Sequence, residues 1–176
     1  MIPARLATAL PVGATICGCH STQHQFSPAT STSTAGIRPS PVRPVQKSQP
    51  TPPATCPAVN ANAPIAPTNV LVTCDLGRAT LYTLAPETMQ LVLKRVEPPK
   101  ALTSDFYEVT LTMDPASVTA WASSAAHLRV HVAFIRDDLV LDAPIIEEPV
   151  TSGRIALTTQ TPQAADQLAQ LAGRPA

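Results

Sequence analysis

The sequence predicts an α+β domain, in which a small, mostly antiparallel sheet has two helices packed on one face and a disordered tether precedes it. Apolar and polar residues alternate from Tyr107 to Met113, with the period of two that is typical of a half-buried strand. Asp114-Pro115 and Thr161-Pro162 each supply an N-cap residue followed by proline at the first helical position. We interpret residues 19–55 as the tether and 56–176 as the folded domain, with residues 1–18 as a separate amino-terminal segment.

The other elements of the folded part follow from similar patterns. Extended segments are expected at residues 71–73, 80–84, 89–96, 130–134, 139–141, 143–146 and 154–158. The polar residues Arg136, Asp137 and Asp138 are expected to form the turn of a hairpin. Trp121 lies on the apolar face of the first expected helix and should anchor the core, and the second helix should end at Gly173.

The first 18 residues have the features of an export signal. Arg5 precedes an apolar run over residues 6–16, shorter than the roughly 20 residues that a membrane-spanning helix needs. The run ends in Ile16-Cys17-Gly18-Cys19, which resembles the lipobox of bacterial lipoproteins. Lipidation is therefore predicted at Cys19, and the protein is expected to be exported and lipid-anchored on the outer face of the bacterial cell membrane. A plain secretory signal without a lipid is the alternative.

Residues 19–55 have the composition of a spacer. The segment is rich in Ser, Thr, Pro and Gln, so it offers little apolar surface to bury, and its prolines remove backbone donors. We expect a disordered, partly polyproline-like tether. A flexible chain of this length would span about 30–35 Å.

Two cysteines remain for the folded part. In an exported protein an even pair is most simply a disulfide, so Cys56 and Cys74 are expected to be bonded to each other. Closing a loop of about 18 residues stabilises the folded state by roughly 3 kcal/mol in the chain-entropy model. The spacing is not CxxC, which argues against a redox role.

No pattern in the sequence supports catalysis or a cofactor. Nucleophile, zinc-protease, P-loop and dinucleotide motifs are absent from the chain. Glu147 and Glu148 are neighbours on an extended segment, so their side chains should point to opposite sides and not converge on a substrate. His127 and His131 straddle an expected helix-to-strand junction and are not expected to hold a metal. The sequence therefore predicts a protein that is not an enzyme, with no cofactor and no metal site.

The distribution of charge argues against nucleic acid as a partner. Residues 1–74 contain four basic side chains and no acidic one, which leaves the remainder with a net charge of −4. Binding to phosphates needs clustered Lys and Arg, which neither part provides.

The order of elements from Thr80 to Ala172 resembles the head subdomain of the first large periplasmic domain of the SecDF protein-export family. The residues that carry the resemblance are Ala143, Pro144, Pro149, Gly153, Arg154 and Thr158, followed by Ala164, Ala165, Leu168 and Ala169. The resemblance implies a head-like fold and contact with exported polypeptide. Two departures affect function: Arg136-Asp137-Asp138 stands where the family hairpin usually turns on Asp-Gly, and this chain has no membrane helices of the kind that drive the family's motor.

The expected function is that of a non-catalytic envelope lipoprotein. Its domain would bind polypeptide or an envelope partner by adding a strand to an exposed sheet edge, in a role accessory to protein export. The alternative is a structural or ligand-binding envelope lipoprotein that is unrelated to export. An exposed edge strand beside an apolar groove would favour the first function, and a deep pocket with convergent polar groups the second.

Overall fold

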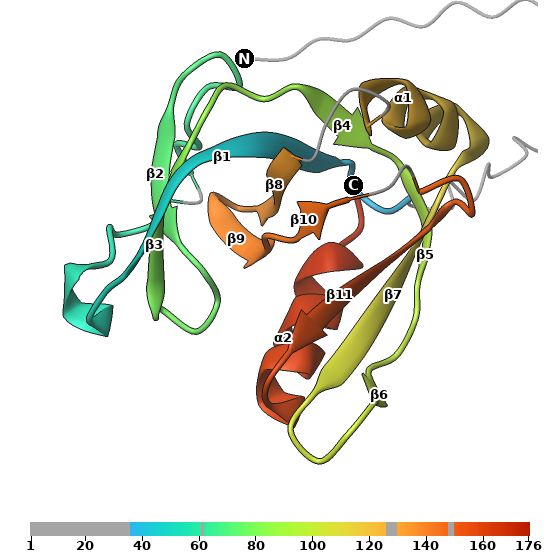
Figure 1. The fold of residues 1–176 in the computed structure, drawn as a ribbon. Coiled ribbons are helices and arrows are strands. Elements are labelled where there is room, and N and C mark those ends of the chain that lie inside the picture. Colours follow the sequence, from blue (N-terminus) through green and yellow to red (C-terminus); the bar gives the residue numbers. More distant parts are fainter. Residues whose placement is uncertain (1–35, 61, 126–129, 148–149) are drawn as a thin grey trace, which may run out of the picture. The chain divides into compact units, whose positions relative to one another are not determined.

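The computed structural model describes residues 36–60, 62–125, 130–147 and 150–176 (Figure 1). The predicted α+β class is confirmed: the strand ladders are antiparallel, and two α-helices accompany them in the part of the chain that is described. The elements are β1 (Ser40–Pro50), the 3-10 turn η1 (Pro53–Thr55), β2 (Leu71–Cys74), β3 (Thr80–Leu84), β4 (Met89–Leu91), β5 (Leu93–Val96), β6 (Lys100–Ala101), β7 (Tyr107–Met113), α1 (Pro115–Ala125), β8 (Val130–Arg136), β9 (Leu139–Asp142), β10 (Ile145–Ile146), β11 (Arg154–Thr159) and α2 (Pro162–Ala172).

The described strands divide between two sheets. The larger has the order β10-β8-β1-β3-β2, with β4 paired to β1 and β9 paired to β8. The smaller has the order β11-β7-β5, with β6 also paired to β7. In the smaller sheet, the register of β11 on β7 places Ile155 opposite Leu111 and Leu157 opposite Val109, so the apolar positions of both strands share one face.

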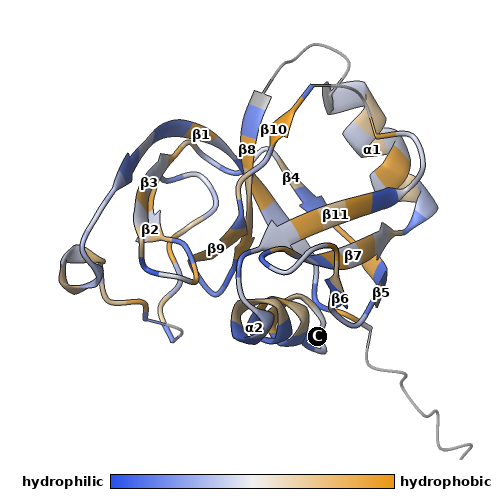
Figure 2. Cartoon of the chain, turned by 60° about the horizontal axis from the view of Figure 1, so that its bottom comes forward, coloured by the Kyte–Doolittle hydropathy of each residue, from blue (hydrophilic) through white to orange (hydrophobic). Residues whose placement is uncertain are grey.

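Five strands of the larger sheet form a ring. The strands β2, β3, β1, β8 and β9 are neighbours in that order, and a parallel bridge between Asp75 and Val140 joins the end of β2 to β9. Figure 2 shows these strands around one interior. The ring encloses a small apolar core made of Leu71, Leu84, Ala133, Ile135 and Val140.

A larger core lies between the ring, the smaller sheet and the helices. The helix α2 packs on β7 and β11 through Ala165, Leu168 and other apolar side chains. The helix α1 lies near β4, and its Trp121 stacks on Phe134 of β8 with ring centroids 5.8 Å apart. Trp121 is therefore the core anchor that the sequence predicts.

The strand β8 takes part in both cores. Successive side chains of a strand point to opposite faces, so Val132 and Phe134 enter the larger core while Ala133 and Ile135 enter the ring. Burial on both faces explains why this strand is an almost continuous apolar run.

The prediction of a disordered tether over residues 19–55 is wrong from Ser40 to Pro50, because this stretch forms β1. The strand pairs with β3, β4 and β8, and Val42 is 1% exposed. Pro44 is tolerated because it lies beside the connection from β3 to β4, where the ladder on that side of β1 is interrupted and Ala85 N donates to Pro44 O. Residues 1–35, which include the predicted signal peptide and Cys19, lie outside the described residues.

Helix caps and turns match the predicted ones. Asp114 Oδ1 accepts a hydrogen bond from Ser117 N at 2.7 Å, and Thr161 Oγ1 accepts one from Ala164 N at 3.1 Å. The β8–β9 hairpin turns on Asp137 and Asp138, whose φ angles of 51° and 58° are those of a type I′ turn. The sequence thus places this hairpin correctly, although neither residue is glycine.

The two ends of the described domain lie side by side. Arg38 N donates to Arg174 O at 2.9 Å, Ala176 N donates to Gly36 O at 2.7 Å, and Ile37 bridges to Pro175. The hairpin turn fixes this pair, because Asp137 binds both Arg38 and Arg174.

In the described ranges no helix combines the length and the apolar character that crossing a bilayer requires.

Candidate functional site

The strand β2 has an open edge over part of its length. Asp75 N donates to Thr80 O at 3.2 Å, so the backbone of Asp75 points to β3. Backbone groups alternate along an antiparallel ladder, and those of Val72 therefore point away from β3. The ring closes at Asp75 and Val140, beyond this point. Among the described residues, none is hydrogen-bonded to the N–H or C=O of Val72, which leaves these groups to an added strand.

An apolar groove follows this edge. A cavity of about 180 Å³ lies between β2 and a segment made of residues 57–60 and 63–65. Its lining includes Val59, Ile65 and Val72, whose exposed fractions are 36%, 44% and 45%. We call this cavity the β2 groove. It combines free backbone groups with apolar side chains, the two features that strand addition uses.

The segment over the β2 groove is fixed at several points. The predicted disulfide between Cys56 and Cys74 is present and joins the start of the segment to the end of β2. Ile65 N donates to Asp138 Oδ2 at 2.9 Å. Arg43 reaches the other end and donates to Ala66 O at 3.2 Å and to Asn69 O at 2.6 Å. The groove is therefore held open by contacts with β1, β2 and the hairpin turn.

Other open strand edges are less suited to pairing with a partner strand. The free half of β1 carries Lys47 and ends at Pro50, and β5 carries Lys94 and is followed by prolines. Charged side chains and proline are common protections of sheet edges. On the outer edge of β11, Thr158 N already donates to Asp142 Oδ2 at 2.9 Å. The strand β2, by contrast, carries neither a charged residue nor proline.

A second cavity adjoins the β2 groove. It has a volume of about 290 Å³, and Ile65 and Asp138 line both cavities. Its other lining residues include Arg38, Arg43 and Arg136. We call it the arginine pocket. A molecule in the groove could therefore extend toward these guanidinium groups.

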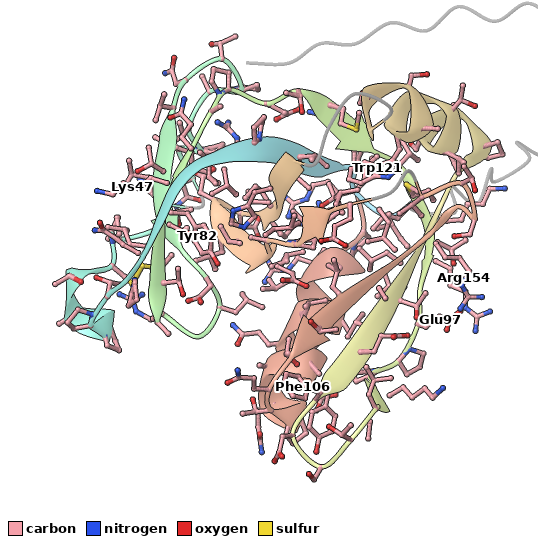
Figure 3. All side chains as sticks on the ribbon, in the orientation of Figure 1. Lys47, Tyr82, Glu97, Phe106, Trp121 and Arg154 are labelled. Carbon is pink, nitrogen blue, oxygen red and sulfur yellow. A yellow bond between two sulfur atoms is a disulfide. The ribbon has the colours of Figure 1, made fainter. Side chains whose placement is uncertain are left out.

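A third cavity, the polar cleft, lies where the ring meets β11 and the start of α2. It has a volume of about 360 Å³, and its lining includes Asp75, Tyr82 and Asp142. Figure 3 places Tyr82 on the β3 side of the ring. Burial raises the pKa of the Tyr82 phenol above its usual value, and the carboxylate of Asp75 raises it further. Tyr82 is thus a protonated hydrogen-bond donor.

Asp142 links the two sheets through the polar cleft. Its Oδ1 accepts a hydrogen bond from Ala143 N at 2.7 Å, and its Oδ2 accepts the one from Thr158 N of β11. Burial raises the pKa of the Asp142 carboxyl above its usual value, although the bonds from Thr158 and Ala143 oppose this rise.

The raised pKa of Asp142 predicts a pH dependence of stability. The folded state binds this proton more tightly than the unfolded state, so the contribution of Asp142 is most favourable below its unfolded pKa. It declines as the pH rises through the folded pKa. Urea unfolding from pH 4 to 7 should show that the stability of the unaltered protein relative to Asp142→Asn falls with rising pH. A difference that grows with pH would contradict this assignment.

The structure separates the other residues that the sequence singles out. Ala143 and Pro144 lie between β9 and β10, whereas Gly153 lies just before β11. The φ of Gly153 is 71°, and a Cβ there would lie 3.0 Å from Val118 Cγ2, so glycine suits the turn. Arg154 forms a surface ion pair with Glu97 at 3.0 Å (Figure 3). These residues do not converge on one site.

Some of the residues that the sequence singles out lie outside the residues that the structure describes. Pro149, Glu148 and His127 fall in its gaps. Glu147 is exposed, and His131 Nε2 lies 2.9 Å from Ala143 O. The described residues contain no group of three or more His, Cys, Asp or Glu that could hold a metal ion.

The sequence interpretation missed the residues that form the groove and the arginine pocket. Arg43 lies in the predicted tether, yet it is 2% exposed and donates a hydrogen bond to the segment over β2. Val42 and Val45 offered a weak strand signal, which the neighbouring prolines obscured. Ile65 and Val72 line the same cavity only in the folded chain, so no local pattern in the sequence connects them.

The fold and the groove define a class of protein: a disulfide-containing α+β domain with an open, apolar strand edge. No protein-family model matches the chain, and no curated protein matches it.

Two solved structures are similar to the chain, each with 15% sequence identity over 78% of it. One is SecDF in a super-membrane-facing form, with a TM-score of 0.48 and 19% of that chain covered. The other is SecDF described as a membrane component that enhances protein export, with a TM-score of 0.49 and 62% of that chain covered. The chain thus spans less than two thirds of either structure. A likeness this distant assigns neither a family nor a function.

Proposed function

We propose that this chain is a non-catalytic binding protein of the bacterial envelope that binds extended polypeptide along β2. The observation that carries the proposal is the open backbone of Val72 beside the apolar β2 groove. An extended peptide would pair its backbone with that of Val72. Its alternate side chains would contact Val59 and Ile65, which are already exposed to solvent. A role accessory to protein export is the specific form of this proposal.

The proposed location is the outer face of the cell membrane. The Cys56–Cys74 disulfide supports it, because such bonds persist in exported proteins and are rare in the reducing cytosol. Lipidation of Cys19 would supply the anchor, and a secreted form without lipid would bind by the same surface. Mass spectrometry of the mature amino terminus tests the lipid separately from binding.

The proposal gives the chain no catalytic role. Tyr82 and Asp142 have raised pKa values and share the polar cleft. Tyr82 stays protonated at neutral pH, and both carboxylate oxygens of Asp142 accept backbone hydrogen bonds. These groups are therefore suited to hydrogen bonding and not to activating a nucleophile.

The polar cleft favours a second candidate function. Its volume of about 360 Å³ and its convergent hydroxyl and carboxylate groups suit a small polar ligand of the cell envelope. In that case the domain would be a ligand-binding lipoprotein unrelated to export. Substitution of Tyr82 by phenylalanine would then weaken ligand binding and leave peptide binding unchanged.

A charged side chain on β2 should weaken peptide binding. We expect Val72→Lys to weaken binding of an apolar extended peptide by about tenfold or more. The lysine replaces apolar surface of the groove with a hydrated charge, and charged side chains on edge strands oppose pairing with another strand. Fluorescence anisotropy with labelled peptides measures the affinity. Val92→Lys is the matched control, since Val92 is 41% exposed and lies between β4 and β5, away from the groove.

Two outcomes would reject strand addition along β2. One is equal weakening by Val72→Lys and Val92→Lys, which would indicate a non-specific effect of charge. The other is undiminished binding of a peptide whose backbone nitrogens are methylated at alternate positions, because such a peptide cannot donate to the C=O of Val72. Circular dichroism verifies that each variant remains folded.

A further inference from the structure

The arginine pocket contains two buried guanidinium groups that make bonds to neutral acceptors. Arg43 and Arg136 are each 2% exposed. Arg136 donates to Pro39 O at 2.9 Å, to Arg38 O at 2.7 Å and to Ala172 O at 3.2 Å. The bonds of Arg43 likewise go to backbone carbonyls. Among the described residues, neither guanidinium forms an ion pair with a carboxylate.

Buried charges without a counter-ion are costly, so they are unusual unless something compensates them. Burial lowers the pKa of Arg136 to about 10, and repulsion from Arg38 acts in the same direction. The group is still charged at neutral pH. The Nε atoms of Arg38 and Arg136 are also buried with no acceptor among the described residues. The pocket therefore has a local excess of unpaired positive groups.

The carboxylates around the pocket do not remove this excess. Asp137 is shared between Arg38 and Arg174, and Asp138 Oδ2 accepts the bond from Ile65 N. Glu87 also lines the pocket and forms no ion pair within the described part of the chain. With Arg174 included, four guanidinium groups face three carboxylates.

We propose that the arginine pocket binds a carboxylate of the polypeptide that occupies the β2 groove. Arg38 would contact the carboxylate, because its side chain is half-buried and lines the pocket. The buried Arg43 and Arg136 would attract the carboxylate through their charge. This inference rests on the proposed function, because the groove must deliver the peptide.

The position of the pocket supports a carboxylate on a peptide. Ile65 and Asp138 line both cavities, so the groove leads directly to the pocket. Prolines such as Pro39 and Pro67 form the remaining walls and suit the apolar part of a chain. The carboxylate could belong to an Asp or Glu side chain or to the carboxyl terminus, and both have the same charge and geometry.

Four peptides of one apolar extended sequence test the proposal against the full-length protein. One carries Glu and an amidated end, one carries Gln and a free end, one carries both acids, and one carries neither. We expect either carboxylate to tighten binding about tenfold over the neutral peptide, and added salt to reduce this gain. A gain from Glu alone identifies the side chain, and a gain from the free end alone identifies the terminus. Equal affinity of all four peptides would overturn the proposal.

Substitution at the rim gives a second test that spares the buried arginines. Glu87→Gln removes a competing negative charge, so acidic peptides should bind severalfold more tightly and the neutral peptide should not change. Gln90→Glu, on the same lining, should weaken acidic peptides by a similar factor. Asp166→Asn, on the exposed side of α2, is the matched control with the same change in net charge.

The two proposals fail in different ways. If no peptide binds, strand addition along β2 is wrong. If all four peptides bind equally and Glu87→Gln behaves like Asp166→Asn, the groove binds peptide but the arginine pocket does not bind its carboxylate. The proposed function then stands and the further proposal is wrong.

Discussion

A chain that begins at Cys56 should fail to fold, whereas one that begins at Gly36 should fold cooperatively. The shorter chain lacks β1, which pairs with β3, β4 and β8 and supplies the buried side chain of Val42. Without β1 the ring has no connection between β3 and β8. We expect this loss to exceed the total stability of an ordinary domain, which is about 5–15 kcal/mol.

Urea unfolding followed by circular dichroism distinguishes the two chains. The chain from Gly36 should give a single sigmoidal transition, and the chain from Cys56 a flat, unstructured response. A cooperative transition in the shorter chain would mean that β1 is dispensable and that the boundary expected from composition is correct after all. Titration of the shorter chain with a synthetic peptide of residues 36–55 offers a rescue test, because the missing strand could be restored in trans.

Replacing Trp121 with alanine should lower the free energy of unfolding by about 3–5 kcal/mol. Trp121 is 3% exposed and stacks on Phe134, so the change would leave a large cavity between α1 and β8. The Nε1 of Trp121 is buried and has no acceptor among the described residues. The loss should therefore come from packing and not from a broken hydrogen bond.

Trp121→Phe is the control for this interpretation. Phenylalanine keeps an aromatic ring against Phe134 and leaves a smaller cavity than alanine, so it should cost clearly less than the alanine substitution. Circular dichroism is the suitable probe, since both variants lack the tryptophan fluorophore. Equal losses in the two variants would show that the N–H, and not the ring volume, matters at this position.

Local signals in the sequence located most of the carboxyl-terminal half. Asp114 and Thr161 are good predictors because a cap depends on neighbours within one turn, and the structure contains both caps. The alternation from Tyr107 to Met113 predicts β7, because a face buried by α2 leaves a period of two in the sequence. The disulfide between Cys56 and Cys74 could be predicted from an even count of cysteines in the expected domain, together with the expectation of export.

The features that sequence reasoning missed depend on distant contacts. The composition of β1, dominated by prolines and polar residues, predicts a tether, yet pairing on both sides overrides that local preference. The ring closes through a bridge between Asp75 and Val140, and no local sequence pattern predicts a bridge between residues so far apart. The candidate site has the same origin, because Ile65, Val72 and Arg43 meet only after β1 takes its place in the sheet.

The side-by-side ends of the domain bear on how it can be carried by other chains. Ala176 N donates a hydrogen bond to Gly36 O, so the two ends of the described domain are separated by about the 5 Å spacing of adjacent strands. A domain of this kind can be inserted into a surface loop of a host protein without stretching the host. The same adjacency would allow its termini to be fused and the chain to be reopened elsewhere, giving a circular permutant with the ring intact.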